Sequence, residues 1–567
     1  MWVVKVADVL AMSEVRPHKL LKAEGLLSEW SAGMFTIFVS HQWLSIQHPD
    51  PDAEQLQVLQ AVLRRLIANT LKIDLDVASQ FFGGKVGKVE IERLGEAYIW
   101  LDYFCVPQLW EGQELLLPEQ TLYIRSIPNY VDHCFVFLAL VPRAIHRQTG
   151  EPCSVHSWLQ RGWCRTELWC NFLSTRSKHL IVVVKSEDNV QFTSPLWHRY
   201  PVHLGDFAIE KDRTSCTLVI QKALSQYISE LRQAKRKRVA YRLYLALFEA
   251  MTGLASKRRS VNDFMEEFSF SQPIERCAGL GPVACAALTG DRDLVRNLVN
   301  AKACLQTHAP AMPEVMYAPD YTPLHLALWF RPHDLQVAET LLELQADPCA
   351  STINLCPPLG YCRSARAVDL LIRHRAGVNF QGKTLTQACP IHNVTSYGAP
   401  CEVVSRLIEL QADVHGGRGG NAALSPLHTI AFSGDSKNDL HNAQLLLDRR
   451  ADVDQVCQPQ GLFRVFELLA RAISRCARQP RALTTLVSNL SATPLGWCAV
   501  FENEGLLIFL IRAYADPDIR SNRGLRPIDI TSSRRIRVLL RDPTPLRIDP
   551  LEQSLDPEQD EMVVEVL

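Results

Sequence analysis

The chain has 567 residues, of which 47% are hydrophobic and 21% are charged, as in soluble proteins with two or more cores. Its formal net charge is -1, so no global field attracts nucleic acid or a membrane surface. No apolar run approaches the ~18 residues of a membrane-spanning helix, and the start of the chain lacks the pattern of a secretory signal. We therefore expect a cytoplasmic protein with no membrane span and no nucleic-acid partner.

The 17 cysteines are scattered, and no Cys-x-x-Cys pair occurs among them. Cys349, Cys356, Cys362 and His374 come nearest to a metal-binding set, but their spacing matches no standard zinc site. We expect free thiols in a reducing compartment and no metal site. Nine of the 11 tryptophans lie before residue 200, which predicts two architectures with a boundary in 235–275.

In the first architecture, short apolar runs alternate with helical segments. The runs are rich in β-formers and are typical of strands buried on both faces; they lie at 34–39, 97–101, 134–138, 180–184 and 200–204. A helix is expected over 53–68, an inserted arm over 70–96 and a lead-in over 1–33. The alternation predicts an α/β fold with a doubly wound parallel sheet.

Polar side chains follow two of these predicted strands directly. In doubly wound sheets, ligands bind beyond the carboxyl ends of the strands. The sequence therefore predicts a ligand site at this edge. Its candidate residues are Ser40, His41, Gln42 and Trp43 after the first strand, and Asp102 and Gln108 after the second.

Three motifs at these positions resemble a known superfamily. They are the strand followed by Ser-His at 34–41, Trp-Leu-Asp at 100–102 and Trp-Cys-x-x-Glu-Leu at 163–168. Together they resemble the Toll/interleukin-1 receptor (TIR) domain over residues 34–233. The run at 98–108 is also similar to the fungal heterokaryon-incompatibility (HET) domain, a relative of TIR. The resemblance implies a flavodoxin-like, doubly wound sheet and a role in signalling or self-association.

In TIR domains that cleave NAD, the glutamate of the third motif is catalytic, and it corresponds to Glu167. A carboxylate there can stabilise the oxocarbenium-like centre left by nicotinamide or orient the attacking hydroxyl. By the same resemblance, Ser40–Trp43 and Asp102 would face the nucleotide, with Trp43 or Trp163 stacked on a ring. NAD would then be a substrate, and no cofactor is otherwise implied.

Structural roles remain open for each of these residues. Glu167 can instead complement the helix dipole from a first turn, and many TIR domains are adaptors that keep the motif without activity. His41 can be a satisfied histidine at a strand end, and Asp102 can cap the turn that follows it. A nucleophilic pair of Cys105 and His41 is a further alternative to a core cysteine.

Residues 234–275 form a helical, basic linker in this interpretation. It contains Lys235-Arg236-Lys237-Arg238, which indicates either a nuclear-localisation or anionic-surface signal or a solvated helix face.

A repeat follows over residues 276–540. Its best unit is Thr322-Pro323-Leu324-His325, a capping Thr before a Pro at the first helical position. Corresponding prolines lie at intervals near the ~33 residues of ankyrin repeats, namely at 282, 323, 358, 390, 426, 459, 494 and 527. The array resembles ankyrin repeats, with seven clear units and a degenerate one at 458–459. The acidic tail, 541–567, is expected to be disordered.

These observations predict an intracellular signalling or scaffold protein that binds protein partners through its ankyrin repeats. The TIR-like domain would be an effector or self-association module. The alternative is an NAD-cleaving hydrolase acting through Glu167 and targeted by its ankyrin repeats.

Overall fold

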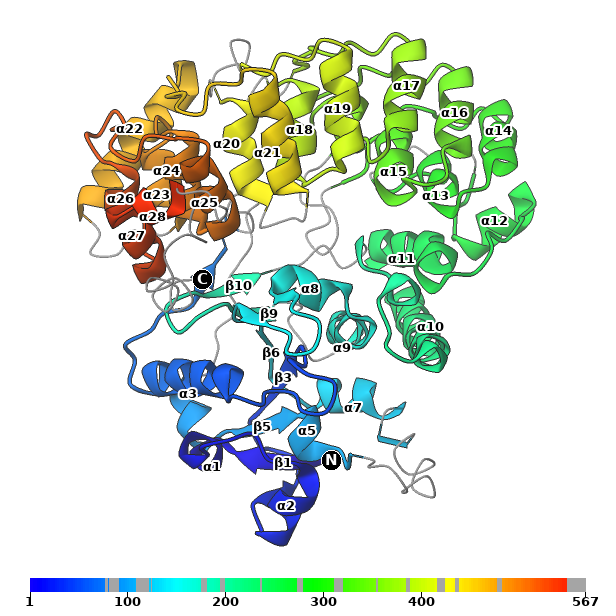
Figure 1. Cartoon of the computed structure of the whole chain (residues 1–567). Coiled ribbons are helices and arrows are strands. Elements are labelled where there is room, and N and C mark those ends of the chain that lie inside the picture. Colours follow the sequence, from blue (N-terminus) through cyan, green and yellow to red (C-terminus); the bar gives the residue numbers. More distant parts are fainter. Residues whose placement is uncertain are drawn as a thin grey trace. The chain divides into compact units, whose positions relative to one another are not determined.

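The structure is a computed structural model of the chain (Figure 1). It divides into two compact units, unit 1 (Met1–Ala346) and unit 2 (Asp347–Leu567). Lys235 and Arg236, most of the predicted arm and the tail beyond 547 lie outside the described residues. The described residues are 1–76, 80, 91–108, 122–123, 125–174, 181–193, 199–234, 237–272, 279–310, 320–352, 355–383, 388–415, 424–433, 438–476 and 482–547.

An eight-stranded sheet organises the first part of unit 1, with the strand order β2-β1-β5-β3-β6-β9-β10-β4. Its four inner strands, β5, β3, β6 and β9, run parallel, and all six residues of β3 are buried. The strands are β1 (Trp2–Lys5), β2 (Leu27–Glu29), β3 (Thr36–His41), β4 (Asp74–Leu75), β5 (Tyr98–Leu101), β6 (Val136–Leu140), β9 (Ile181–Val184) and β10 (Val190–Thr193).

The sheet is mixed, so the prediction of a wholly parallel sheet is wrong. β1 pairs antiparallel with β2 and β5, which brings the predicted lead-in, 1–33, into the sheet. β10 pairs antiparallel with β9 because the turn between them is too short for a parallel crossover. The strand predicted at 200–204 is instead a 3-10 helix, η4 (Val202–Leu204), bracketed by Pro201 and Gly205.

Helices pack around this sheet, and aromatic rings fill the space between them. α9 (Gly162–Leu173) contacts β3, α7 (Ile127–Asp132) and α10 (Glu210–Gln233). Trp100, Trp158 and Trp169 are among the largest fully buried side chains, which explains why tryptophan concentrates in this part of the chain. Of the predicted arm, the structure describes β4 and the 3-10 helix η1 (Ile91–Glu96).

The predicted linker, 234–275, packs against the repeats. The chain leaves the helical conformation at Ala234, which separates α10 from α11 (Arg238–Thr252). α11 contacts α13 (Pro282–Thr289), and α12 (Val261–Glu267) contacts α14 (Arg292–Asn300). α11 and α12 therefore cover the first helix pair of the repeat array. The end of a solenoid needs such a cap, because its apolar face has no further repeat to pack against.

Seven repeat units have a helix that starts at the predicted proline, each in the first helical position. These helices are α13, α15 (Pro323–Phe330), η6 (Pro358–Tyr361), α18 (Pro390–Ser396), α20 (Pro426–Ile430), α24 (Pro494–Phe501) and α26 (Pro527–Ile530). A second helix completes each unit: α14, α16 (Gln336–Glu343), α17 (Ala365–Arg373), α19 (Cys401–Glu409), α21 (Asp439–Asp448), α25 (Glu504–Arg512) and α27 (Arg534–Arg541).

Hydrogen bonds in unit 2 reveal how successive repeats follow one another. His392 Nε2 lies 3.0 Å from the carbonyl of Leu424, the residue just before the next capping serine. His428 Nε2 makes the same contact, at 3.1 Å, with Ala492, just before Thr493. α20 and α21 accordingly contact α24 and α25. The repeat that begins at Ser425 is therefore followed in the stack by the one at Thr493.

The degenerate unit predicted at 458–459 is thus not a member of the stack. No helix begins at Pro459. The segment between the two repeats instead forms α22 (Gly461–Cys476) and α23 (Ala482–Ser488). The physical reason is Gln460, a polar residue at the position where each of the seven stacked units carries an apolar residue directly after its proline.

His428 makes unit 2 sensitive to acid. Burial lowers its pKa to about 3, while unfolded histidine titrates near 6.5. The unfolded state therefore binds more protons below pH 6.5, and stability falls as pH falls. We expect a loss of about 2 kcal/mol from His428 between pH 7 and pH 5. Hydrogen exchange of the α24 amides should show this loss in the wild type and not in His428→Leu; equal slopes would contradict it.

Among the described residues, no helix combines the length and the apolar composition needed to cross a membrane. Every cysteine in the described ranges is a free thiol.

Candidate functional site

The predicted polar edge of the sheet is built by neighbouring parallel strands. Ser40 and His41 end β3, and Asp102 directly follows β5, which pairs with β3 in parallel register. Parallel strands bring their carboxyl ends to one edge of a sheet, so these side chains come together. Glu167 joins them from the second turn of α9.

His41 and Asp102 form an ion pair in which His41 is buried and Asp102 is partly exposed, with His41 Nε2 2.9 Å from Asp102 Oδ1. The other ring nitrogen, Nδ1, lies 2.9 Å from Gln55 Oε1 in α3 (Glu54–Ile67). The Gln55 amide is oriented by its Nε2, which donates to the carbonyl of Gln42 at 2.8 Å. Both partners of the His41 ring are therefore acceptors, so both ring nitrogens donate and the ring is an imidazolium.

The pKa shifts of His41 and Asp102 agree with an imidazolium paired to a carboxylate. Burial lowers the pKa of His41, but the charge of Asp102 and the hydrogen bonds to Asp102 and Gln55 outweigh it and raise the pKa above its ordinary value. Burial raises the pKa of Asp102, but His41 and the N–H groups of Trp43 and Tyr103 outweigh it and lower the pKa. Both shifts favour the ionised form of the pair.

Glu167 has the opposite tendency. Its side chain is 8% exposed, and burial raises its pKa to about 8 against a hydrogen bond from Ser40 that lowers it. Ser40 Oγ lies 2.5 Å from Glu167 Oε2 and accepts a hydrogen bond from Trp158 Nε1 at 2.9 Å. The indole N–H can only donate, so it fixes the Ser40 hydroxyl in position to face the carboxyl group.

The dipole alternative for Glu167 is wrong, because the first turn of α9 holds no acid. The glycine before the motif is required by close packing: a Cβ on Gly162 would lie 2.1 Å from the ring of Phe207. Gly205 also approaches the backbone of Gly162, where a Cβ would lie 2.6 Å from its Cα. This close approach fixes where α9 begins, and therefore where Glu167 lies relative to the edge of the sheet.

The other candidates differ in where they point. Trp43 donates through Nε1 to Asp102 Oδ2 at 2.9 Å and so belongs to the cluster. Gln42 accepts from Ser157 Oγ at 2.7 Å and donates to Cys153 Sγ at 3.1 Å, which ties the strand end to the start of α8 (Val155–Gln160).

Trp163, Gln108 and Cys105 lie outside the cluster. Trp163 donates to Asp212 of α10 at 3.2 Å, so its indole is directed toward that helix. Gln108 donates to the carbonyl of Val106. Cys105 is buried, its Sγ lies 3.9 Å from the carbonyl of Ile99, and burial raises its pKa far above the ordinary value, which leaves a thiol and not a nucleophilic thiolate.

Sequence reasoning missed Gln55 and Trp158. A signal for Gln55 was present, because it stands at helical spacing on the same buried stripe as Leu59, Val62 and Leu66. A polar side chain on such a stripe indicates a buried hydrogen-bond partner. Trp158 carried no comparable signal, since its contact with Ser40 spans 118 residues.

The cluster holds two carboxyl groups in different states. Glu167 tends to keep a proton near neutral pH, while Asp102 is ionised beside an imidazolium. Environments that separate two pKa values in this way are typical of acid and base pairs. No group of three or more His, Cys, Asp or Glu side chains that could hold a metal ion occurs among the described residues.

The second functional region is the array, whose paired helices and proline-started units define a helical repeat protein. Residues 320–353 match the ankyrin repeat family. Two solved structures are similar to part of this chain. The ankyrin repeat domain of human ASB11 is 18% identical, with a TM-score of 0.32, and the match covers 48% of this chain and 99% of that one. The ankyrin repeat domain of Bcl-3, a member of the IkappaB protein family, is 21% identical, with a TM-score of 0.28 and coverage of 46% and 98%. The search of curated proteins finds no match.

Proposed function

We propose that this chain is a scaffold that binds a protein partner through its ankyrin repeats, with residues 34–233 as a TIR-like effector or self-association domain. The observation that carries the proposal is the array of proline-started helix pairs, linked in unit 2 from repeat to repeat by hydrogen bonds. Ankyrin arrays present an extended surface that other proteins bind.

Phe380 is the residue we expect to anchor the partner. It lies in the turn after α17, next to Asn379, and its side chain is 41% exposed. Asn379 ties this turn to the next one through Gln411 and Asp413, at 2.9 Å each, so the ring is held on a rigid edge. Exposed aromatic side chains on rigid elements are the usual anchors of protein interfaces.

Affinity capture by the full chain tests this assignment. Phe380→Ala should lose the partner, whereas Leu440→Ala, at an equally exposed leucine in the first turn of α21, should retain it. Recovery of the same proteins by both variants would contradict the role of Phe380. Recovery of no protein above background would contradict the scaffold function.

The TIR-like assignment of 34–233 has support in the inner strand order, β5-β3-β6-β9. With β3 counted as the first strand, this is the order 2-1-3-4 of doubly wound sheets of the flavodoxin type. The Trp-Cys-x-x-Glu-Leu motif lies in α9, beside that edge.

The polar cluster favours a second candidate function, cleavage of NAD. Glu167, Ser40 and the His41–Asp102 pair occupy the edge where such sheets bind ligands, and the cluster combines a protonated with an ionised carboxyl group. Glu167 loses its proton near pH 8, and the resulting carboxylate would stabilise the positive charge that develops on the ribose as nicotinamide leaves.

Release of nicotinamide from NAD by the full chain at high protein concentration tests the second candidate. Glu167→Gln keeps the shape of the side chain and removes its ability to ionise, so activity measured at or above pH 8 should fall at least a hundredfold. Glu151→Gln, at an exposed acid, is the matched control. Absence of release from folded wild-type protein, or equal rates in wild type and Glu167→Gln, would exclude this candidate.

A further inference from the structure

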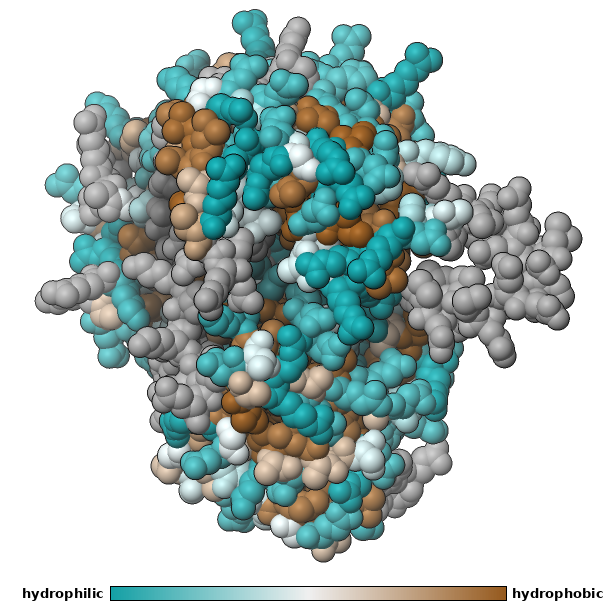
Figure 2. Space-filling model, turned by 90° about the vertical axis from the view of Figure 1, so that its left-hand side faces the viewer, coloured by the Kyte–Doolittle hydropathy of each residue, from teal (hydrophilic) through white to brown (hydrophobic). Residues whose placement is uncertain are grey.

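α22 presents an apolar stripe to solvent. Five large apolar side chains share one face of the helix, because they recur at intervals of three or four residues or one further turn. They are 40–58% exposed, and they are Leu462, Val465, Phe466, Leu469 and Ile473. α22 lies at the left of Figure 1, and Figure 2 views the molecule from that side, with apolar side chains set among polar ones. A surface helix normally turns such a stripe toward its core.

The buried side of α22 is polar instead. Glu467 is fully buried, and its carboxylate pairs with Arg464 at 2.5 Å and Arg471 at 2.8 Å. It is the only acid of the helix, so the exposed charges are arginines: the side chain of Arg464 is 43% exposed, and Arg475 is exposed. The stripe is therefore bordered by positive charge alone.

α22 is not part of the repeat stack, because the repeat before it and the repeat after it are hydrogen-bonded directly to each other through His428 and Ala492. The stripe is thus free for another occupant. A second copy of α22 is disfavoured, since two antiparallel copies would bring arginines against arginines. The complement of the stripe is a segment that is both acidic and apolar.

This chain contains such a segment directly after α28 (Thr544–Arg547), whose Leu546 carbonyl accepts a hydrogen bond from Arg512 of α25 at 3.3 Å. Residues 548–567 carry seven acids and no lysine or arginine. Their apolar residues are Ile548, Leu551, Leu555, Met562, Val563, Val564, Val566 and Leu567.

We propose that residues 548–567 bind along the apolar stripe of α22, with their acids paired to the arginines that border it. The 16 residues of α22 span about 24 Å, and 20 extended residues reach about 66 Å, so the tether is long enough to lie along the helix. A tether of this length gives an effective concentration of about 1 mM, which favours the contact within one chain over partners in solution.

Hydroxyl-radical footprinting of the full chain tests the contact, because it reports the exposure of single side chains. The variant replaces the seven acids of 548–567 by Asn and Gln, a change that leaves the repeats untouched. We expect labelling of Phe466, Leu469 and Ile473 to rise at least threefold in this variant. Leu440 and Val538, exposed apolar residues on α21 and α27, are the internal controls and should not change.

Further arms identify other occupants. The double variant Arg464→Glu, Arg475→Glu of the full chain removes the positive charges beside the stripe. It should raise labelling of the stripe as much as replacing the seven acids of 548–567 does. Equal labelling of the stripe in wild type and tail variant would overturn the proposal. Low labelling in both that rises on dilution would assign the stripe to a second copy. If the stripe is labelled weakly in wild type and in the tail variant only after vesicles of phosphatidylcholine and phosphatidylserine are added, the stripe would be assigned to a lipid surface.

Discussion

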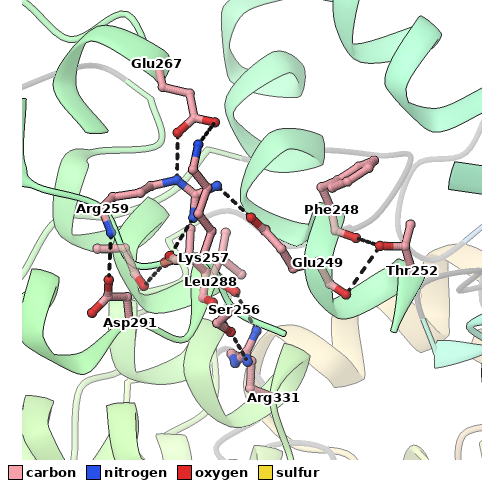
Figure 3. Close-up of polar contacts among 12 residues, drawn as sticks. Phe248, Glu249, Thr252, Ser256, Lys257, Arg259, Glu267, Leu288, Asp291 and Arg331 are labelled. Atoms are coloured by element: carbon pink, nitrogen blue, oxygen red, sulfur yellow. Dashed lines mark hydrogen bonds and ion pairs between the residues drawn. The ribbon is translucent and has the colours of Figure 1, made fainter. Parts of the chain in front are cut away.

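Replacing Arg259 by methionine is expected to lower the free energy of unfolding of the α11–α12 cap by roughly 3–5 kcal/mol. The Arg259 side chain is 2% exposed and lies 2.7 Å from Glu249 and 2.6 Å from Glu267 (Figure 3). Methionine keeps most of the volume but removes the charge. Glu249, itself 9% exposed and with Oε2 already lacking a hydrogen-bond partner, would be left as an uncompensated buried carboxylate.

Hydrogen exchange of the α11 and α12 amides measures this loss. Arg296→Met is the matched control, because its pair with Glu343 is 40% and 51% exposed and should contribute at most about 1 kcal/mol. The double variant Arg259→Met with Glu249→Leu should recover much of the loss, since both charges are then gone. A loss below about 1 kcal/mol in Arg259→Met would contradict a buried, charge-dependent cap.

The second large effect is a change in how stability depends on pH when Glu167 is replaced by glutamine. Folded Glu167 holds its proton up to about pH 8, whereas its ordinary pKa is 4.5. The native state therefore binds more protons between these values, and its stability falls as pH rises. Glutamine does not titrate. Relative to wild type, Glu167→Gln should gain about 3 kcal/mol between pH 5 and pH 8.

Urea unfolding followed by tryptophan emission measures this difference, because nine of the 11 tryptophans lie before residue 200. His41, with its raised pKa, also contributes stability that is lost as pH rises. Most of this contribution is common to both proteins, because Asp102 and Gln55 raise the His41 pKa more than Glu167 does. Glu151→Gln should follow the wild type at every pH. Parallel curves for wild type and Glu167→Gln would mean that the carboxyl group is ionised and solvated in the native state.

The fold was predictable where local chemistry and period agree. A Pro followed by an apolar residue recurs at intervals near 33 residues, so the repeat positions could be found without tertiary information. The inner strands were predictable because they are buried and contain short apolar runs, such as Ile37-Phe38-Val39 in β3. The exclusion of the α22–α23 segment from the stack was not predictable, because the segment is about as long as one repeat. Only the contact between His428 and Ala492 shows which repeats are neighbours in the stack.

The site was predictable as an edge but not as a cluster. Ser40 and His41 end β3 and Asp102 directly follows β5, so the pairing of these two strands brings them together. Glu167 was expected in a first turn, and its second-turn position depends on the approach of Gly205 to Gly162, a contact between distant segments. Trp163 was expected at the nucleotide, but its bond to Asp212 depends on α10 packing against α9.

The most direct test of the scaffold function is the dissociation constant of a partner recovered by affinity capture, measured on the purified full chain. For Phe380→Ala we expect binding at least thirtyfold weaker, equivalent to about 2 kcal/mol, as for an aromatic anchor. Leu440→Ala should bind within a factor of two of the wild type. Equal affinities for wild type and Phe380→Ala would contradict binding through the turns of the ankyrin repeats.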